Sequence, residues 1–176
     1  AGGAGLAGLH AMQDAGFETR SFEQNAELGG VWATTKYPSL TIHSRSFNYR
    51  FHDFPPISSA GPCATREEVH AYLTSYARAK SIADKITYDT CVERITVRRA
   101  QRDCLVETTG GAHTCDVVIC ATGYAGAGRP HVPELANRET SQVTVVHSGA
   151  LTSAMVDDIT AHRRKVVVLG AGKSAH

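Results

Sequence analysis

The sequence lacks long apolar runs and any excess of charge of one sign. Its longest uncharged apolar stretches, residues 117–121 and 166–169, have five and four residues, whereas a membrane-spanning helix needs about 20. The 18 basic and 17 acidic residues leave a net charge of +1, so the composition implies no nucleic-acid partner. These absences predict a globular protein with no membrane span. The motifs described below predict the α/β class, and the unpaired cysteines favour a cytoplasmic location.

Paired metal-binding or disulfide motifs are also missing. The five cysteines are an odd number with no CxxC pair, which argues against a disulfide framework and a paired thiolate metal site. The nine histidines show no HxxxH or HxH spacing, so no metal is expected. We interpret the cysteines as mostly structural, because a free cysteine behaves as a small buried hydrophobic residue.

Glycine-rich turns lie near both ends of the chain. The first, over residues 3–8, has the pattern GxGxxG and opens a short helix predicted over residues 5–15. In dinucleotide-binding folds these glycines permit a tight turn, the approach of a pyrophosphate, and the packing of helix on strand. Glu23 follows Gly3 by 20 residues, where an acid can bind ribose hydroxyls. A glycine-rich helix start without a ligand is the open alternative.

The second turn, GxGxxA, follows a buried strand predicted over residues 165–169. Lys173 and Ser174 lie beside this turn, where they can meet a phosphate, and a solvated lysine at a helix end is an equal alternative for Lys173. A chain that binds two dinucleotides usually passes electrons between them. A flavin paired with a nicotinamide is therefore the leading chemistry.

The middle of the chain mixes helix, loop and strand patterns. A weak strand is predicted over 17–23, a long irregular stretch over 24–62, and a helix with a capping motif over 65–80. Three β-rich runs follow, at 86–97, 104–108 and 115–121, and predict a small antiparallel meander that leads into a buried strand. One further strand is expected over 143–147.

Several segments resemble the flavin-containing monooxygenases and their Baeyer–Villiger and N-hydroxylating relatives. The similar segments are the "E, spacer, GGxW" stretch at 22–32, the loop over the flavin at 37–44, the DFP turn at 52–55, a helix at 66–76, and the ATGY crossover at 121–124 with Pro130 and Pro133 after it. The family's FxGxxxHS fingerprint is represented only by its last two residues, His147 and Ser148. The resemblance covers nearly the whole chain.

The resemblance implies a domain plan and two cofactors. Residues 1–150 would form a Rossmann-like FAD-binding domain that lacks its first strand and carries a small β-meander insertion. Residues 151–176 would form a linker and the truncated start of a second, NADPH-binding Rossmann-like domain. The implied FAD contacts are Gly3, Gly5, Leu6, Ala7, Gly8, Glu23, Gly30, Val31, Trp32, His43, Ser44, Val92, Thr122 and Gly123, and NADPH would dock at Gly170, Gly172, Lys173 and Ser174.

The activity implied by the resemblance is oxygenation. Members of the family reduce FAD with NADPH and transfer one oxygen atom from O2 to a small organic substrate. His43 is the candidate catalytic residue, since it stands where many flavin-containing monooxygenases have asparagine. Both side chains donate a hydrogen bond, but histidine also titrates near neutral pH. A loop histidine that only packs is the alternative, and an internal fragment of a longer enzyme is expected to be inactive alone.

Two other functions stay open. A pyridine nucleotide-disulfide oxidoreductase also carries two dinucleotide domains, and Cys115 and Cys120 have a CxxxxC spacing. The residues between them predict a buried strand, however, which favours a structural role for both thiols. The third possibility is a non-catalytic nucleotide-binding remnant. The sequence leaves open the oligomeric state and the choice among N-, S- and Baeyer–Villiger oxygenation.

Overall fold

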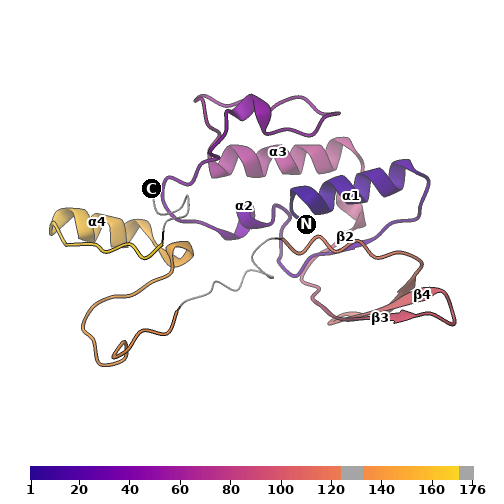
Figure 1. Cartoon of the computed structure of the whole chain (residues 1–176). Coiled ribbons are helices and arrows are strands. Elements are labelled where there is room, and N and C mark those ends of the chain that lie inside the picture. Colours follow the sequence, from indigo (N-terminus) through magenta and orange to yellow (C-terminus); the bar gives the residue numbers. More distant parts are fainter. Residues whose placement is uncertain (124–132, 171–176) are drawn as a thin grey trace.

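The computed structural model describes residues 1–123 and 133–170. Figure 1 shows helices α1 and α3 side by side, with the antiparallel sheet on the far side of α1 from α3 and helix α4 to one side of this body. The helices are α1 (Gly3–Asp14), α2 (Val31–Thr34), α3 (Arg66–Ala79) and α4 (Ser153–Ala161); the strands are β1 (Ser21–Phe22), β2 (Ile86–Thr87), β3 (Val92–Arg98), β4 (Asp103–Thr108) and β5 (Gly111–Cys115); and short 3-10 turns are η1 (Ser46–Asn48), η2 (Ala83–Lys85) and η3 (Ser148–Ala150). No helix within the described residues is long and apolar enough to cross a membrane.

Helix α3 forms where its local signals place it. The Thr65 hydroxyl accepts a hydrogen bond from the backbone N–H of Glu68, and the Glu68 carboxylate accepts one from the backbone N–H of Thr65. This reciprocal capping box satisfies two donors that the helix itself leaves unpaired. The buried side chains of α3 recur at helical spacing, at positions 69, 72, 73, 76 and 77. The helix predicted over 65–80 is confirmed, and α1 begins two residues before its predicted start.

The hydrophobic core lies between α1 and α3. It contains Leu6, Leu9, Leu28, Ile42, Ile57, Ala64, Val69, Tyr72, Leu73, Tyr76, Ala77, Ile82 and Ile86. Aromatic rings close one end of it, because Phe51 stacks on Tyr76 with 3.7 Å between ring centroids. Burial raises the pKa of Tyr76 to about 12, so its hydroxyl stays neutral at physiological pH.

Two small sheets lie next to the helices. β1 pairs in parallel with β2, and β3, β4 and β5 form an antiparallel sheet in that order. The pairing of β1 with β2 continues past the strand ends, because the N–H of Glu23 donates to the carbonyl of Thr87 at 2.9 Å and the N–H of Thr90 donates to the carbonyl of Glu23 at 2.9 Å. The ring of His113 in β5 packs on Phe22 of β1, with centroids 4.8 Å apart. The predicted meander is thus present and docks on β1.

Several predicted strands are wrong. The strand expected over 17–23 shortens to residues 21–22, and the run 86–97 divides into β2 and β3. The third run shifts, since β5 ends at Cys115 and the following residues carry no strand. Residues 143–147 and 165–169 also form no strand, and Val167 is 82% exposed rather than buried. An apolar run becomes a strand only when a neighbouring strand satisfies its backbone groups, and no strand among the described residues pairs with these segments.

The capping box of α3 gives the first testable prediction. Replacing Thr65 by alanine removes the acceptor for the Glu68 N–H, so we expect the free energy of unfolding to fall by about 1 kcal/mol. Urea denaturation followed by circular dichroism measures this change. Thr65→Ser keeps the hydroxyl and is the matched control. Equal midpoints for Thr65→Ala and the unmodified chain would show that the cap does not stabilise α3.

Candidate functional site

The start of α1 has free hydrogen-bond donors. Gly2 precedes the helix, and no side chain caps it. The first N–H groups of a helix have no intrahelical acceptor and carry its partial positive charge. Gly3 lines a pocket of about 220 Å³ together with Asn48, Tyr49, Arg50, Phe51, Tyr72 and Leu73. This geometry suits an anionic group such as a pyrophosphate.

The turn at Gly29 and Gly30 lies directly against the start of α1. The N–H of Gly29 donates to the carbonyl of Ala1 at 2.8 Å. Gly30 has a φ of +56°, and a Cβ added there would lie 3.0 Å from the Cα of Gly2. Only a residue without a side chain permits this backbone approach. Two glycine segments therefore meet at one place, although Gly29 follows Gly2 by 27 residues in the sequence.

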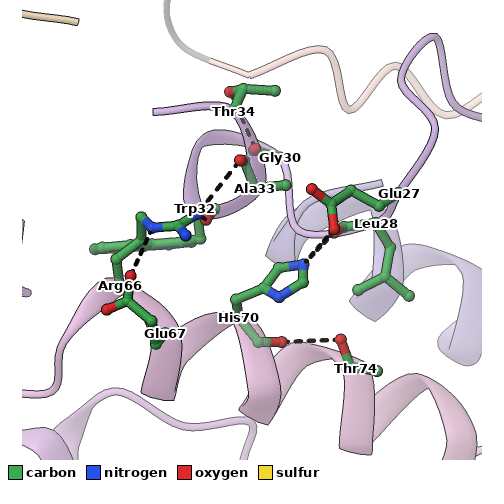
Figure 2. A network of polar contacts seen from close by, with 10 residues as sticks. All are labelled: Glu27, Leu28, Gly30, Trp32, Ala33, Thr34, Arg66, Glu67, His70 and Thr74. Carbon is green, nitrogen blue, oxygen red and sulfur yellow. Dashed lines mark hydrogen bonds and ion pairs between the residues drawn. The ribbon is translucent and has the colours of Figure 1, made fainter. Parts of the chain in front are cut away.

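Helix α3 holds this turn through the polar contacts shown in Figure 2. His70 donates from Nε2 to the carbonyl of Leu28 at 2.9 Å, and the same nitrogen lies 3.5 Å from the Glu27 carboxylate. One turn earlier, Arg66 donates from Nη1 to the carbonyls of Trp32 at 3.0 Å and Ala33 at 3.4 Å. Both side chains come from a helix that is itself fixed in the core. They therefore hold residues 27–33 in place beside α1.

Trp32 reaches the pocket through Tyr49. Its indole Nε1 donates to the hydroxyl of Tyr49 at 2.9 Å, and the two rings meet edge to face with centroids 5.9 Å apart. Tyr49 lines the pocket beside Gly3. Trp32 thus contacts the pocket wall through the Tyr49 side chain.

Glu23 is buried near the start of α1, and its carboxylate already has partners. The carboxylate Oε1 accepts hydrogen bonds from the backbone N–H and the side-chain amide of Asn25, at 2.8 and 2.6 Å. Glu23 follows the end of β1, where a ribose would have to share or replace the bonds to Asn25.

The segment after β5 packs against the glycine face of α1. A Cβ added at Gly5 would lie 3.7 Å from the Cβ of Ala121, and one added at Gly8 would lie 3.6 Å from Cγ2 of Ile119. The second and third glycines of the motif thus face this segment at ordinary contact distance. Residues 122 and 123 follow directly, so the structure brings them to the same end of α1.

The remaining predicted contacts have varied environments. Leu6 is fully buried, and its N–H donates to the carbonyl of Gly2 at 2.9 Å. His43 and Ser44 are exposed on a loop that hydrogen bonds from Ile42 to Ala64 and from Ser46 to Pro62 fix at both sides. Ala7 is half-buried, Val31 and Val92 are exposed, and Gly170 has a φ of +130°. Gly172, Lys173 and Ser174, like Tyr124 and Pro130, lie outside the described residues.

Sequence reasoning missed the residues of the pocket wall opposite Gly3. Asn48 to Phe51 belong to the long irregular stretch, which has no periodicity that could have indicated a pocket.

The adjoining DFP turn is held between two helices. Asp53 pairs with Lys80 at the C-terminus of α3 at 2.5 Å and with His10 of α1 at 3.1 Å. The hydrogen bond from Lys80 holds the pKa of Asp53 below its ordinary value. In the described residues, no group of three or more histidine, cysteine or acidic side chains could hold a metal ion.

Comparison with known proteins identifies relatives of this chain. The model of the family described as L-lysine 6-monooxygenase/L-ornithine 5-monooxygenase matches residues 43–176. A Baeyer-Villiger monooxygenase of Streptomyces coelicolor is 28% identical over 153 residues, which cover 87% of this chain and 28% of that protein. The FAD-dependent monooxygenase DEP4 of Alternaria brassicicola is 31% identical over 163 residues, which cover 88% of this chain and 27% of that protein.

Solved structures have the same fold. A closed crystal structure of cyclohexanone monooxygenase matches with a TM-score of 0.75 at 21% identity, over 87% of this chain and 30% of that one. An oxidized steroid monooxygenase bound to NADP matches with a TM-score of 0.58 at 27% identity, over 63% of this chain and 22% of that one. The predicted α/β, Rossmann-like fold class is confirmed. The chain spans less than a third of the length of each of these proteins.

The close approach at residues 29 and 30 gives the second prediction. Gly29 has a φ of +127°, and an added Cβ would lie 2.6 Å from Cδ2 of His70. We therefore expect Gly29→Ala to lower the free energy of unfolding by more than about 1 kcal/mol, as measured by urea denaturation. Gly61→Ala is the control, because its Cβ would meet only Cys63 O at 3.8 Å. Identical midpoints for the two variants would contradict the account of this turn.

Proposed function

The chain belongs to the L-lysine 6-monooxygenase/L-ornithine 5-monooxygenase family of flavin-dependent monooxygenases, and from this we propose that it forms part of an FAD- and NADPH-dependent monooxygenase. The enzyme would transfer one atom of O2 to a small organic substrate by N-, S- or Baeyer–Villiger oxygenation. The observation that carries the proposal is the pocket at the start of α1, which Gly3 lines together with residues 48–51. The activity is proposed for a protein of the relatives' length, of which this chain forms the part described above.

The pyrophosphate of FAD is proposed to bind at the first turn of α1. Its uncapped N–H groups supply donors, and Arg50, a basic residue, is among those that line the same pocket. Gly3 leaves room there, since the nearest atom to an added Cβ is Cδ2 of Leu73 at 4.0 Å. A helix start of this kind stabilises an anion through both its dipole and its donors.

The rest of the dinucleotide would extend along the ends of β1 and β3. Glu23 is proposed to bind the ribose, and Val92 would lie near the adenine. The backbone supports this assignment, because Thr90 bonds to the carbonyl of Glu23 only two residues before Val92. Thr122 and Gly123 would contact the flavin at the crossover. NADPH is proposed to dock at Gly170, Gly172, Lys173 and Ser174.

FAD, when bound, supplies the hydride acceptor and the centre at which O2 reacts. The role of the chain is to bind this group, orient it and exclude water from it. His43 is proposed to donate a hydrogen bond at the reacting face. Its loop is held at Ile42 and Ser46 by the backbone bonds to Ala64 and Pro62, so the backbone that carries this exposed imidazole is fixed on both sides.

The pocket beside Gly3 leads to the third prediction. Gly3→Ala adds one methyl group, which the fold accommodates, but this group narrows the space at the start of α1. We expect FAD affinity to fall by about tenfold or more, which corresponds to at least about 1.4 kcal/mol, with unchanged circular dichroism. Quenching of FAD fluorescence in the protein of the relatives' length measures the affinity. Gly110→Ala, on the β4–β5 turn, is the control, and equal FAD affinity for both variants would contradict the assignment.

The fourth prediction concerns His43. In the same protein, His43→Ala removes a hydrogen-bond donor, so we expect product formed per NADPH oxidised to fall by about 100-fold, with the missing oxidation recovered as hydrogen peroxide. His43→Asn keeps a hydrogen-bond donor and should restore coupling. Ser44→Ala is the neighbouring control. Full coupling in His43→Ala would show that this histidine only packs.

A further inference from the structure

Two of the cysteines lie directly opposite each other on neighbouring strands. Cys104 of β4 and Cys115 of β5 are register partners in the antiparallel pair. The Sγ of Cys115 lies 3.9 Å from the carbonyl oxygen of Cys104. Directly opposed residues of antiparallel strands have Cα atoms about 4.5–5.5 Å apart, which lies within the range of about 4.4–6.8 Å that a disulfide requires. The strand register thus places the two cysteines at a separation that a disulfide can span.

Both thiols are half-buried on the inner face of the meander. Val106 and Thr108, which follow Cys104 at intervals of two residues along β4, are buried. On β5, His113 rests on Phe22 of β1 and shares this face with Cys115 two residues later. Residues that alternate along a strand point to the same side of the sheet. The side chains of Cys104 and Cys115 therefore lie on the same face of the sheet as Val106, Thr108 and His113.

The other cysteines are placed differently. Cys91 and Cys120 are exposed, the former before β3 and the latter after β5. Cys63 is half-buried and packs against the core between the helices. Within the paired strands of the described residues, Cys104 and Cys115 form the one cysteine–cysteine register pair. The pairing is thus a property of the fold and not of the CxxxxC spacing of Cys115 and Cys120.

We propose that Cys104 and Cys115 are a redox modification site that forms a cross-strand disulfide when the protein meets hydrogen peroxide. One thiolate attacks a peroxide oxygen, the O–O bond breaks, hydroxide leaves and a sulfenic acid forms. The second thiolate attacks that sulfur, the S–O bond breaks, hydroxide leaves and the S–S bond forms. The two thiols lose two electrons and two protons, and the peroxide is reduced to two water molecules.

The bond would act on the segment that follows β5. Cys115 leads directly into residues 116–121, whose Ile119 and Ala121 face Gly8 and Gly5 of α1. A covalent link to the central strand β4 would fix the start of this segment and restrict how it moves against the helix. The modification itself depends only on the strand register, and it stands independently of the proposed oxygenase activity.

The electrostatic surroundings give the reaction a pH signature. Burial, followed by the nearby negative charges of the Cys104 thiolate, Asp116 and Asp103, raises the pKa of the Cys115 thiol. From β3, Arg98 faces Asp103 with a bidentate ion pair at 2.8 and 2.7 Å and offsets part of that charge. Because the thiolate is the reactive form, bridge formation is expected to accelerate as pH rises through the alkaline range.

Peptide mapping tests the fifth prediction. The folded chain is treated with equimolar hydrogen peroxide and then digested without reductant by a protease that cleaves after glutamate and aspartate. Cleavage after Glu107 separates Cys104 from Cys115, and cleavage after Asp116 separates Cys115 from Cys120. We expect a joined peptide that contains Cys104 and Cys115, is lighter by two hydrogen atoms, and is split by dithiothreitol. Cys115→Ser should abolish it, and Cys91→Ser should leave it unchanged.

A second measurement protects the test against variants that fail to fold. The same peroxide treatment is applied to the unmodified chain in urea, which unfolds the paired strands. The Cys104–Cys115 peptide should then be no more abundant than peptides joined through the other cysteines. The proposal would be overturned if the folded chain gave mainly peptides joined through Cys91 or Cys120. It would also be overturned if Cys104 and Cys115 remained free thiols at a peroxide concentration that oxidises the exposed cysteines.

Discussion

The contact between the turn at Gly29 and Gly30 and the start of α1 is the constraint on which the candidate site depends. A Cβ at Gly30 would lie 3.0 Å from the backbone of Gly2, and a Cβ at Gly29 would lie 2.6 Å from the ring of His70. Helix α3 maintains the contact through His70 and Arg66, which bond to carbonyls on the two sides of the turn. Because α3 also supplies five of the thirteen buried core residues, the stability of the fold and the shape of the pocket depend on the same packing.

The site is assembled from segments that are far apart in the sequence. The pocket is lined by the helix start, by residues 48–51 and by α3, and the glycine turn and the segment after β5 pack against the same helix start. None of these segments would make the proposed dinucleotide site by itself. The helix start offers donors, the glycines allow close approach, and Trp32 bonds to Tyr49 of the aromatic wall. This division of tasks is what the family membership leads one to expect of a domain that binds a flavin.

Local features were predictable from the sequence, and non-local pairing was not. The capping residues and helical spacing of α3, and the glycine motif of α1, act within one or two turns of helix, so their positions follow from the residues alone. The apolar runs at 117–121 and 165–169 were predicted as buried strands, because strand formation was inferred without knowing which neighbour would pair with them. Glu23 directly follows β1 and its bonds to Asn25 are local, but its burial depends on the tertiary fold. The pocket wall at residues 48–51 has no periodic pattern and becomes visible only in the structure.

The most direct test of the central claim is the visible absorbance spectrum of the purified protein at the relatives' full length. The account predicts a yellow protein whose flavin bands bleach when NADPH is added without oxygen and return in air, because the pocket at α1 is proposed to bind FAD and the second glycine turn is proposed to bind NADPH. A folded protein that is colourless, takes up no added FAD and does not respond to NADPH would contradict it, and the glycine motifs would then be a scaffold without a cofactor.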